Sequence, residues 1–346
     1  MKTLFSFFFL CLLTNGLIFA QNISGNLSQL LNQEIRLEGF NGLNTYSISK
    51  TVTNVKGEFE LSYTTKDRGV GYLMSADNKP LFVILSGEDI QLQGEALSIP
   101  ESISITRGEQ NKNFEQYALE QPKREQALSA WGYLQKMYAV DSLFSIHSEP
   151  LKAIEEERQR IKTEEKSFLN QLPKESYVSW FLPTRKLVSS VSTVAQYRPD
   201  EIPNTIASFR TLDYTDKRLY KSGLFKDAIE SHFWLLENSG KSLDSVFIEL
   251  QLSIDAMMVN LVKDEKKLNE VTNYLFDLLE SHSLFQASEY LALKVLNETS
   301  CTIDSDLAKQ LESYRVMKKG NIAADINFGN TTYLNGNIPM VNDSTF

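Results

Sequence analysis

The stretch EFELSY, residues 58–63, alternates polar and apolar side chains at every position. The neighbouring sequence repeats this alternation in three further stretches: EIRLE (34–38), YSIS (46–49) and DIQLQ (89–93). In contrast, the stretch PLFVIL (80–85) is apolar throughout, which suits a strand covered on both faces. Turn-forming Gly, Asn and Asp residues separate these runs. The sequence therefore predicts an antiparallel β-sandwich or barrel-like domain over residues 21–107.

The pattern changes near Glu109, where glycine becomes scarce and apolar residues take helical spacing. In residues 151–172, Ile154, Ile161, Phe168 and Leu172 recur at spacings of seven, seven and four, which place them on one face of a helix. The charged run 155–160 is interpreted as a solvated face. We expect further helices over these ranges: 177–197, with a break or a start at Pro183, 205–212, 222–237, 242–262, 265–279, 283–297 and 303–318.

Two of these helices carry residues suited to cap their amino-terminal ends, Ser242 and Asp304. The sequence thus predicts an α+β protein in which an all-α helical domain, residues 108–319, follows the β domain. The polar stretch 106–112 lies where the period changes and marks the expected junction. Residues 320–346 lose helical periodicity and are interpreted as a linker with a hairpin, or as the first piece of a further domain.

The amino terminus has the order of features found in secretory signal peptides. Lys2 is followed by an apolar run from Leu4 to Leu13, and Ala20 is a small residue at the expected cleavage position. The alternative is an uncleaved anchor, but the run is shorter than the ~20 residues that span a bilayer. We expect residues 1–20 to be removed and the remainder to be periplasmic or extracellular, with no stable membrane span.

The sequence contains none of the cysteine and histidine arrangements typical of catalysis or metal binding. Of the two cysteines, Cys11 leaves with the signal peptide, so Cys301 has no partner for a CxxC pair. The three histidines, His147, His232 and His282, lack metal-binding spacing. A net charge of −9 disfavours nucleic acid as a partner. We assign no catalytic, cofactor-binding or metal-binding residue, no cofactor, and no enzyme activity to the chain as given.

The tryptophans are the most informative aromatic residues. Trp131, Trp180 and Trp234 all lie in the helical half. On amphipathic helices such residues usually belong to the core, and the alternative is a pocket or partner surface lined by aromatic rings. We therefore name these three residues as a possible surface for a partner or a ligand.

Short motifs give the chain a resemblance to a known family. In the β region they are ISGNL (23–27), IRL (35–37), VKGEF (55–59) and LFVILSGEDI (81–90), and TLDYTDKRL (211–219) adds one from the helical region. They resemble the amino-terminal module and helical region of exported TlpA/ResA-like thiol–disulfide oxidoreductases of Bacteroidetes. The resemblance covers roughly residues 22–330.

In that family a segment similar to residues 319–328 introduces a thioredoxin-like domain with a WCxxC motif. The sequence ends at Phe346 before such a motif, so the resemblance assigns no catalytic cysteine. We expect an exported, non-catalytic binding or scaffold module whose partner is an unknown exported protein or small ligand. The alternatives are a fragment of a periplasmic thiol–disulfide oxidoreductase whose catalytic domain is absent, and an independent solute- or glycan-binding protein.

Overall fold

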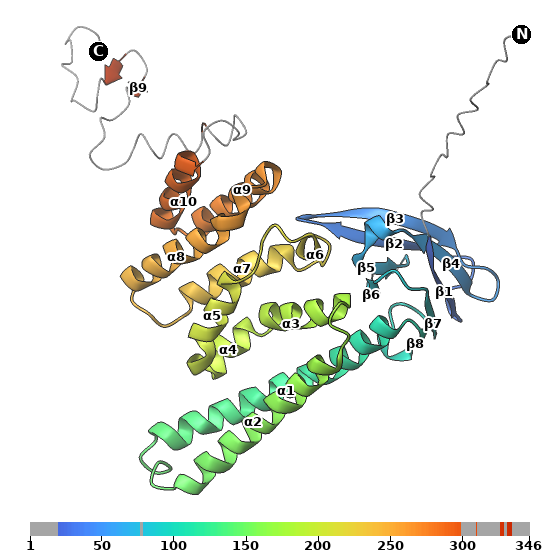
Figure 1. Cartoon of the computed structure of the whole chain (residues 1–346), viewed down its shortest axis with the longest axis horizontal. Helices are drawn as coiled ribbons and strands as arrows, with labels where there is room; N and C mark the ends of the chain where they lie inside the picture. Colours follow the sequence, from blue (N-terminus) through green and yellow to red (C-terminus); the bar gives the residue numbers. More distant parts are fainter. Residues whose placement is uncertain (1–19, 77–78, 299–308, 310–325, 329–330, 334–346) are drawn as a thin grey trace, which may run out of the picture. The chain divides into compact units, whose positions relative to one another are not determined.

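A computed structural model describes residues 20–76, 79–298, 309, 326–328 and 331–333 (Figure 1). These residues form two sheets followed by helices, which confirms the predicted α+β class. The chain divides into two compact units, the first comprising the residues up to Gly39 and Thr45–Glu115, the second Phe40–Asn44 and the residues from Gln116 onward. The sequence-based boundary at 107/108 lies eight residues before this one, which falls inside a helix.

Several sequence predictions concern residues outside the described ranges. They include the signal peptide over residues 1–20, except Ala20, the Asp304 cap, and almost all of the helix expected over 303–318. In the tail, two short strands are described, β9 (Ile326–Phe328) and β10 (Thr331–Tyr333), and they pair antiparallel. The hairpin expected in residues 320–346 is therefore present at this position.

The first unit contains two four-stranded sheets with strand orders β4-β1-β7-β8 and β3-β2-β5-β6. Their strands are β1 (Gln21–Leu27), β2 (Glu34–Asn41), β3 (Asn44–Val52), β4 (Glu58–Tyr63), β5 (Gly69–Met74), β6 (Leu81–Leu85), β7 (Ile90–Gly94) and β8 (Ser104–Arg107). The prediction of purely antiparallel sheets is wrong at one pair, because β1 and β7 run parallel. Between β1 and β7 the chain forms strands of both sheets before it returns to pair with β1. The alternation of polar and apolar residues within one strand does not indicate the direction of the neighbouring strand.

A single apolar core joins the two sheets. In β4, Phe59, Leu61 and Tyr63 are buried while the residues between them are exposed, as the alternation predicts. They share this core with Ile35 and Leu37 of the other sheet. The predicted sandwich is therefore present, because each sheet buries one face against the same set of side chains.

The first turn of the helix α1 (Glu109–Val140) belongs to the first unit and is hydrogen-bonded within it. The carboxylate of Glu88 accepts hydrogen bonds from the backbone N–H groups of Glu109 and Gln110, at 3.1 and 2.9 Å. Two residues into the helix, the buried Asn111 side chain bonds both backbone groups of Ile84 in β6. Asn111 thus satisfies backbone groups that an edge strand would otherwise leave unpaired.

The second unit is mainly helical, and most of its helices follow the predicted ranges within a few residues. Its helices after α1 are α2 (Ser148–Gln171), α3 (Tyr177–Ser189), α4 (Val191–Tyr197), α5 (Ile202–Arg210), α6 (Lys217–Tyr220), α7 (Phe225–Glu237), α8 (Leu243–Leu261), α9 (Glu265–Ser281) and α10 (Phe285–Glu298). The helix expected over 177–197 is divided at Ser190, and the short helix α6 lies in no predicted range. The Ser242 cap is confirmed, since its side chain accepts a hydrogen bond from Ser245 N. The break expected at Pro183 is wrong, because α3 continues through this proline and ends at Ser189. A proline inside a helix removes one N–H and bends the helix without having to end it.

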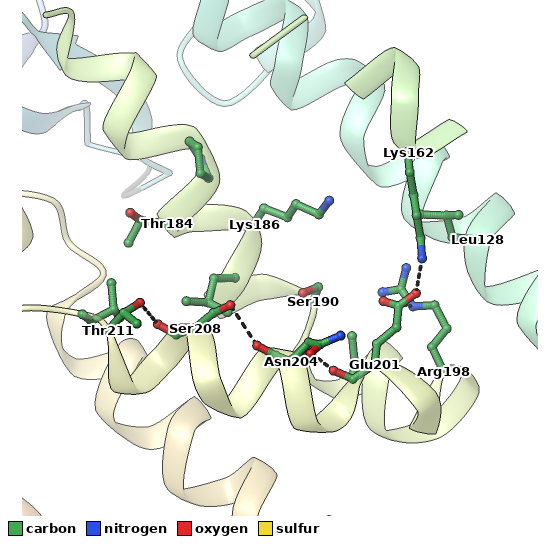
Figure 2. Close-up of a pocket in the computed structure, with 15 residues that line it drawn as sticks. Leu128, Lys162, Thr184, Lys186, Ser190, Arg198, Glu201, Asn204, Ser208 and Thr211 are labelled. Atoms are coloured by element: carbon green, nitrogen blue, oxygen red, sulfur yellow. Dashed lines mark hydrogen bonds and ion pairs between the residues drawn. The ribbon is translucent and has the colours of Figure 1, made fainter. Parts of the chain in front are cut away.

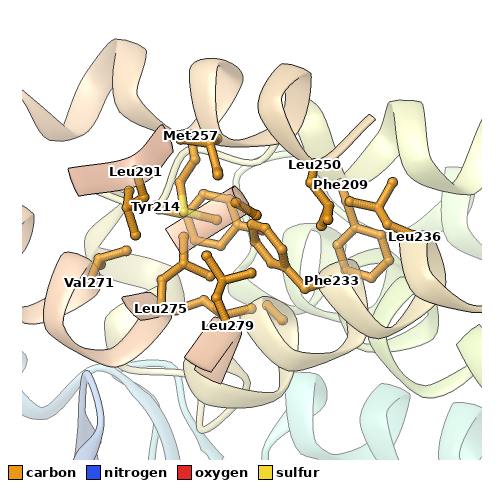
Figure 3. Close-up of a cluster of buried hydrophobic side chains, with 14 of the residues drawn as sticks. Phe209, Tyr214, Phe233, Leu236, Leu250, Met257, Val271, Leu275, Leu279 and Leu291 are labelled. Atoms are coloured by element: carbon orange, nitrogen blue, oxygen red, sulfur yellow. The ribbon is translucent and has the colours of Figure 1, made fainter. Parts of the chain in front are cut away.

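One large apolar cluster holds α5 and α7–α10 together (Figure 3). Its labelled side chains include Phe209, Phe233, Leu250 and Leu275, all of which are almost fully buried. Burial of each such side chain contributes about 1.5–3 kcal/mol relative to exposure. This cluster therefore provides a rigid base for α5, the helix that forms one side of the pocket described next.

Candidate functional site

A pocket of about 540 Å³ opens among the helices of the second unit (Figure 2). Its volume is within the range of small-molecule sites. The polar residues that line it come from α2, α3, the end of α4, and α5 with its flanking turns: Lys162, Thr184, Lys186, Ser190, Arg198, Glu201, Asn204, Thr205, Ser208 and Thr211. Leu128, Pro183, Leu187, Val194 and Leu212 supply its apolar wall.

Arg198 is the most deeply buried charge in this pocket, with 2 % of its surface exposed. Its guanidinium donates a hydrogen bond of 2.6 Å to the Glu125 carboxylate and lies 3.5 Å from Glu201 Oε2. The atom nearest to Glu201 is Nε, which makes this ion-pair contact but no hydrogen bond. A buried guanidinium costs several kcal/mol to desolvate and is tolerated only with such partners.

Glu201 is the carboxylate that links the basic side chains. Its Oε1 atom accepts hydrogen bonds from Lys162 Nζ at 2.7 Å and from the Arg158 guanidinium at 3.2 Å. Arg158 is 3 % exposed and also lies 3.2 Å from Asp200 Oδ2. The interpretation of residues 155–160 as a solvated face is therefore wrong for Arg158.

Lys186 approaches the pocket from α3 and pairs with Glu165 of α2. The Glu165 side chain is 4 % exposed and also accepts a hydrogen bond of 2.7 Å from the buried Tyr117 phenol. Burial, followed by the negative charge of Glu165, raises the pKa of Tyr117 well above its usual value. The phenol therefore stays protonated and acts as a donor to Glu165.

The α5 side of the pocket carries a row of hydroxyl groups, and each of them donates its hydrogen bond to a backbone carbonyl of the helix. Thr205, Ser208 and Thr211 donate to the carbonyl oxygens of Glu201, Asn204 and Ser208, at 2.9, 2.9 and 2.7 Å (Figure 2). Across the pocket, Thr184 does the same toward Trp180 O at 2.9 Å. A hydroxyl that already donates its single proton in one hydrogen bond can only accept further hydrogen bonds. This side of the pocket therefore offers acceptors.

The positive charges line the pocket, and most of the carboxylates that pair with them lie behind this lining. Lys162, Lys186 and Arg198 line it together with a single carboxylate, Glu201. Glu125 and Glu165 pair with two of these cations but do not line the pocket. A ligand would therefore meet an excess of positive charge at contact distance, balanced by carboxylates behind it. Such an arrangement suits binding by charge-assisted hydrogen bonds.

The structure separates the three tryptophans named from the sequence. Trp131, in α1, is half-buried, and Trp180 packs on Tyr177 with the Arg218 guanidinium 4.9 Å from its ring centre. Trp234, in α7, is 37 % exposed and lines a second groove, of about 430 Å³, with Glu230 and His282. None of them lines the 540 Å³ pocket, and within the described ranges no ring contact joins any two of them.

Other residues considered from the sequence lie elsewhere. His232 is fully buried in the helical core, His282 pairs with Glu237 at 2.9 Å, and His147 precedes α2. Among the residues that the structure describes, no group of three or more His, Cys, Asp or Glu side chains could hold a metal ion. Cys301 lies outside the described residues. No helix in the described part of the chain has the length and apolarity needed to cross a membrane.

Sequence reasoning missed the residues of the 540 Å³ pocket because they come from separate helices. One signal was available in α2. Ile154 and Ile161 are buried, and Arg158 and Glu165 continue the same stripe at offsets of four. A charged residue at an apolar spacing indicates a buried pair. Comparisons with protein-family models, with curated proteins and with solved structures found no match.

Proposed function

We propose that this chain is an exported, non-catalytic binding module of the TlpA/ResA-like kind, and that its helical unit holds a small polar ligand. The features at residues 1–20 support export, and the motifs quoted above support the family. The module would act in the periplasm or outside the cell. The lining of the pocket supports binding over catalysis, because the hydroxyls of Thr184, Thr205, Ser208 and Thr211 donate to backbone carbonyls and not to a base.

The observation that carries the proposal is the burial of Arg158 and Arg198 beside the pocket. Replacing a buried ion pair by apolar residues of similar volume is often neutral or stabilising, so stability alone does not account for these charges. Their retention fits a role in positioning Glu201 and Lys162, which do reach the pocket.

A ligand screen tests the proposal. The chain from residue 21 onward is titrated with a library of small polar solutes, first by thermal shift and then by calorimetry. We expect at least one solute to bind, and binding to be lost in the double variant Asn204→Ala/Ser208→Ala, which changes two exposed pocket residues. Lys166→Met, on the exposed face of α2 and outside the pocket, is the control. Binding that survives the double variant, or no binding by any solute, would count against the pocket as a ligand site.

The proposal of a non-catalytic chain has its own test. An insulin-reduction assay should show no turnover, because exchange by a dithiol needs an attacking and a resolving sulfur. Turnover that disappears in Cys301→Ser would contradict this part of the proposal.

A further inference from the structure

The two sides of the 540 Å³ pocket differ in the hydrogen bonds that they can make. Asn204, Ser208 and Thr211 follow one another along the exposed face of α5 and the turn after it. The hydroxyls in this row are acceptors, because each donates its proton to a helix carbonyl. The Asn204 amide, which bonds no other described residue, adds one donor and one acceptor group. A ligand that lies on this row must bring hydroxyl groups that can both donate and accept.

The opposite side of the pocket supplies donors with positive charge. Figure 2 shows the Lys186 side chain extended along the pocket, with Lys162 on α2 beyond it. The Lys186 and Lys162 side chains are 32 % and 39 % exposed, and an ammonium group has three donors, so each can donate to a ligand in addition to its partner carboxylate. Behind them lies the buried Arg198, whose Nε makes no hydrogen bond but lies 3.5 Å from Glu201 Oε2. These groups favour an anionic acceptor on the ligand.

The charges also restrict the kind of anion. Every cation that lines the pocket already has a carboxylate partner, Glu201, Glu165 or Glu125. With these partners counted, the site has little net positive charge left, so it suits a single carboxylate better than a doubly charged phosphate ester. A ligand ammonium group would lie against the lysines and the arginine. A single carboxylate, with hydroxyl groups elsewhere on the ligand, fits both sides.

We infer that the pocket binds a hydroxylated monocarboxylate of monosaccharide size, a sugar acid such as a hexuronate. The carboxylate would lie toward Lys162 and Lys186, and the ring hydroxyls along Asn204, Ser208 and Thr211. The apolar face of the ring would pack on the wall formed by residues such as Pro183 and Leu212. The inference rests on the proposed function, since it names the ligand class of the same pocket.

The test compares matched ligands by calorimetry on the chain from residue 21 onward. D-Glucuronate and D-galacturonate are the probes. D-Glucose and D-galactose lack the carboxylate, propionate lacks the hydroxyls, and glucose 6-phosphate carries a dianion. We expect a uronate to bind at least about tenfold more tightly than its neutral sugar, the value of one good charge-assisted contact. We expect a similar advantage over propionate, which keeps the carboxylate but loses the hydrogen bonds of the ring hydroxyls.

Variants assign the two ends of the ligand. Lys162→Met should weaken uronate binding about tenfold, since it removes one charge-assisted contact. The fold should tolerate this change, because Glu201 keeps Arg158 and Arg198 as partners. Asn204→Ala/Ser208→Ala should weaken uronate binding and leave propionate unchanged. Lys166→Met should bind like the parent chain.

The outcomes separate this inference from the proposed function. Equal binding of uronate and neutral sugar, tighter binding of glucose 6-phosphate, or an unchanged affinity in Lys162→Met would overturn the assignment of a sugar acid. If another solute binds and the double variant abolishes its binding, the ligand class is wrong while the pocket remains a ligand site. If no solute of any class binds, both proposals fail.

Discussion

The Tyr117 phenol in α1 donates a hydrogen bond of 2.7 Å to Oε1 of Glu165 in α2, and both side chains are buried. The second carboxylate oxygen of Glu165 binds Lys186 of α3. One buried carboxylate therefore joins three helices that stand next to one another in sequence. Removing a single partner from such a carboxylate costs more than the bond itself, because the charge stays buried.

Tyr117→Phe should lower the free energy of unfolding by about 1.5–3 kcal/mol, the range for a hydrogen bond to a charged group. The ring remains, so packing on Phe168, whose ring centre is 5.8 Å away, is retained. Urea denaturation measures the change. Tyr133→Phe, at a position in the same helix that is 57 % exposed, is the control and should have little effect. Equal losses in the two variants would contradict the role given to the Tyr117 hydroxyl.

Asn111→Leu should destabilise the first unit by about 3 kcal/mol. The change leaves both backbone groups of the fully buried Ile84 without the bonds of 2.7 and 2.9 Å that Asn111 makes. Each buried polar group left unpaired costs about 1–3 kcal/mol. Lys112→Leu, at the exposed neighbouring position, is the control, because it also introduces a leucine but removes no hydrogen bond to Ile84. Chemical denaturation followed by circular dichroism should separate the two variants clearly.

His232 should make stability depend on pH. Burial, and to a lesser degree the charge of Arg210, lowers its pKa to about 3. Its ring stacks on Phe209 at 5.1 Å, its Nδ1 lies 3.4 Å from the Tyr214 hydroxyl and its Nε2 has no hydrogen-bond partner, so the charged ring would have at most one partner. The unfolded chain takes up that proton near pH 6.5 and the folded chain does not. The free energy of unfolding should therefore fall as the pH drops below 6.5, by about 2 kcal/mol between pH 7 and pH 5.

The variant His232→Gln isolates this contribution. Whatever its stability at pH 7, it should lose about 2 kcal/mol less than the parent chain between pH 7 and pH 5. His282→Gln removes a more exposed histidine and should keep the steep dependence of the parent. If His232→Gln and the parent chain lose stability in parallel, the buried histidine is not the group that titrates.

The sequence predicted those parts of the fold whose signal lies within one segment. Alternation located β4 and the strands like it, because each one has a buried and an exposed face. It missed β5 (Gly69–Met74), whose first three residues are all buried and include two glycines. The parallel pairing of β1 with β7 was also missed, since it depends on a connection through the other sheet.

The candidate site was harder to predict than the fold for a related reason. Lys162, Lys186 and Asn204 are ordinary surface-type residues, each on a different helix. Only the packing of α2, α3 and α5 brings them to one pocket. The three tryptophans attracted attention because large aromatic residues are often found in binding sites, yet none of them lines this pocket. The burial of Arg158 could have been read from its spacing between Ile154 and Ile161.

Gly132 lies in α1 where this helix meets the end of α4. A Cβ atom on Gly132 would lie 2.6 Å from the backbone oxygen of Tyr197 and 3.2 Å from Cγ of Arg198. Two effects of Gly132→Ala therefore oppose each other. Alanine favours a helix over glycine by about 1 kcal/mol, and overpacking a close contact costs about 1–3 kcal/mol.

The contact should be the larger effect, because the neighbour is a backbone carbonyl, which cannot rotate away as a side chain would. We expect Gly132→Ala to lower the free energy of unfolding by about 1 kcal/mol. Ala130→Gly, at an exposed position of the same helix, measures the propensity alone and should also cost about 1 kcal/mol. Because Arg198 follows Tyr197 and lines the pocket, Gly132→Ala should in addition weaken ligand binding there, whereas Ala130→Gly should not. A stabilised Gly132→Ala variant with unchanged binding would mean that α4 can move away from α1 without disturbing Arg198.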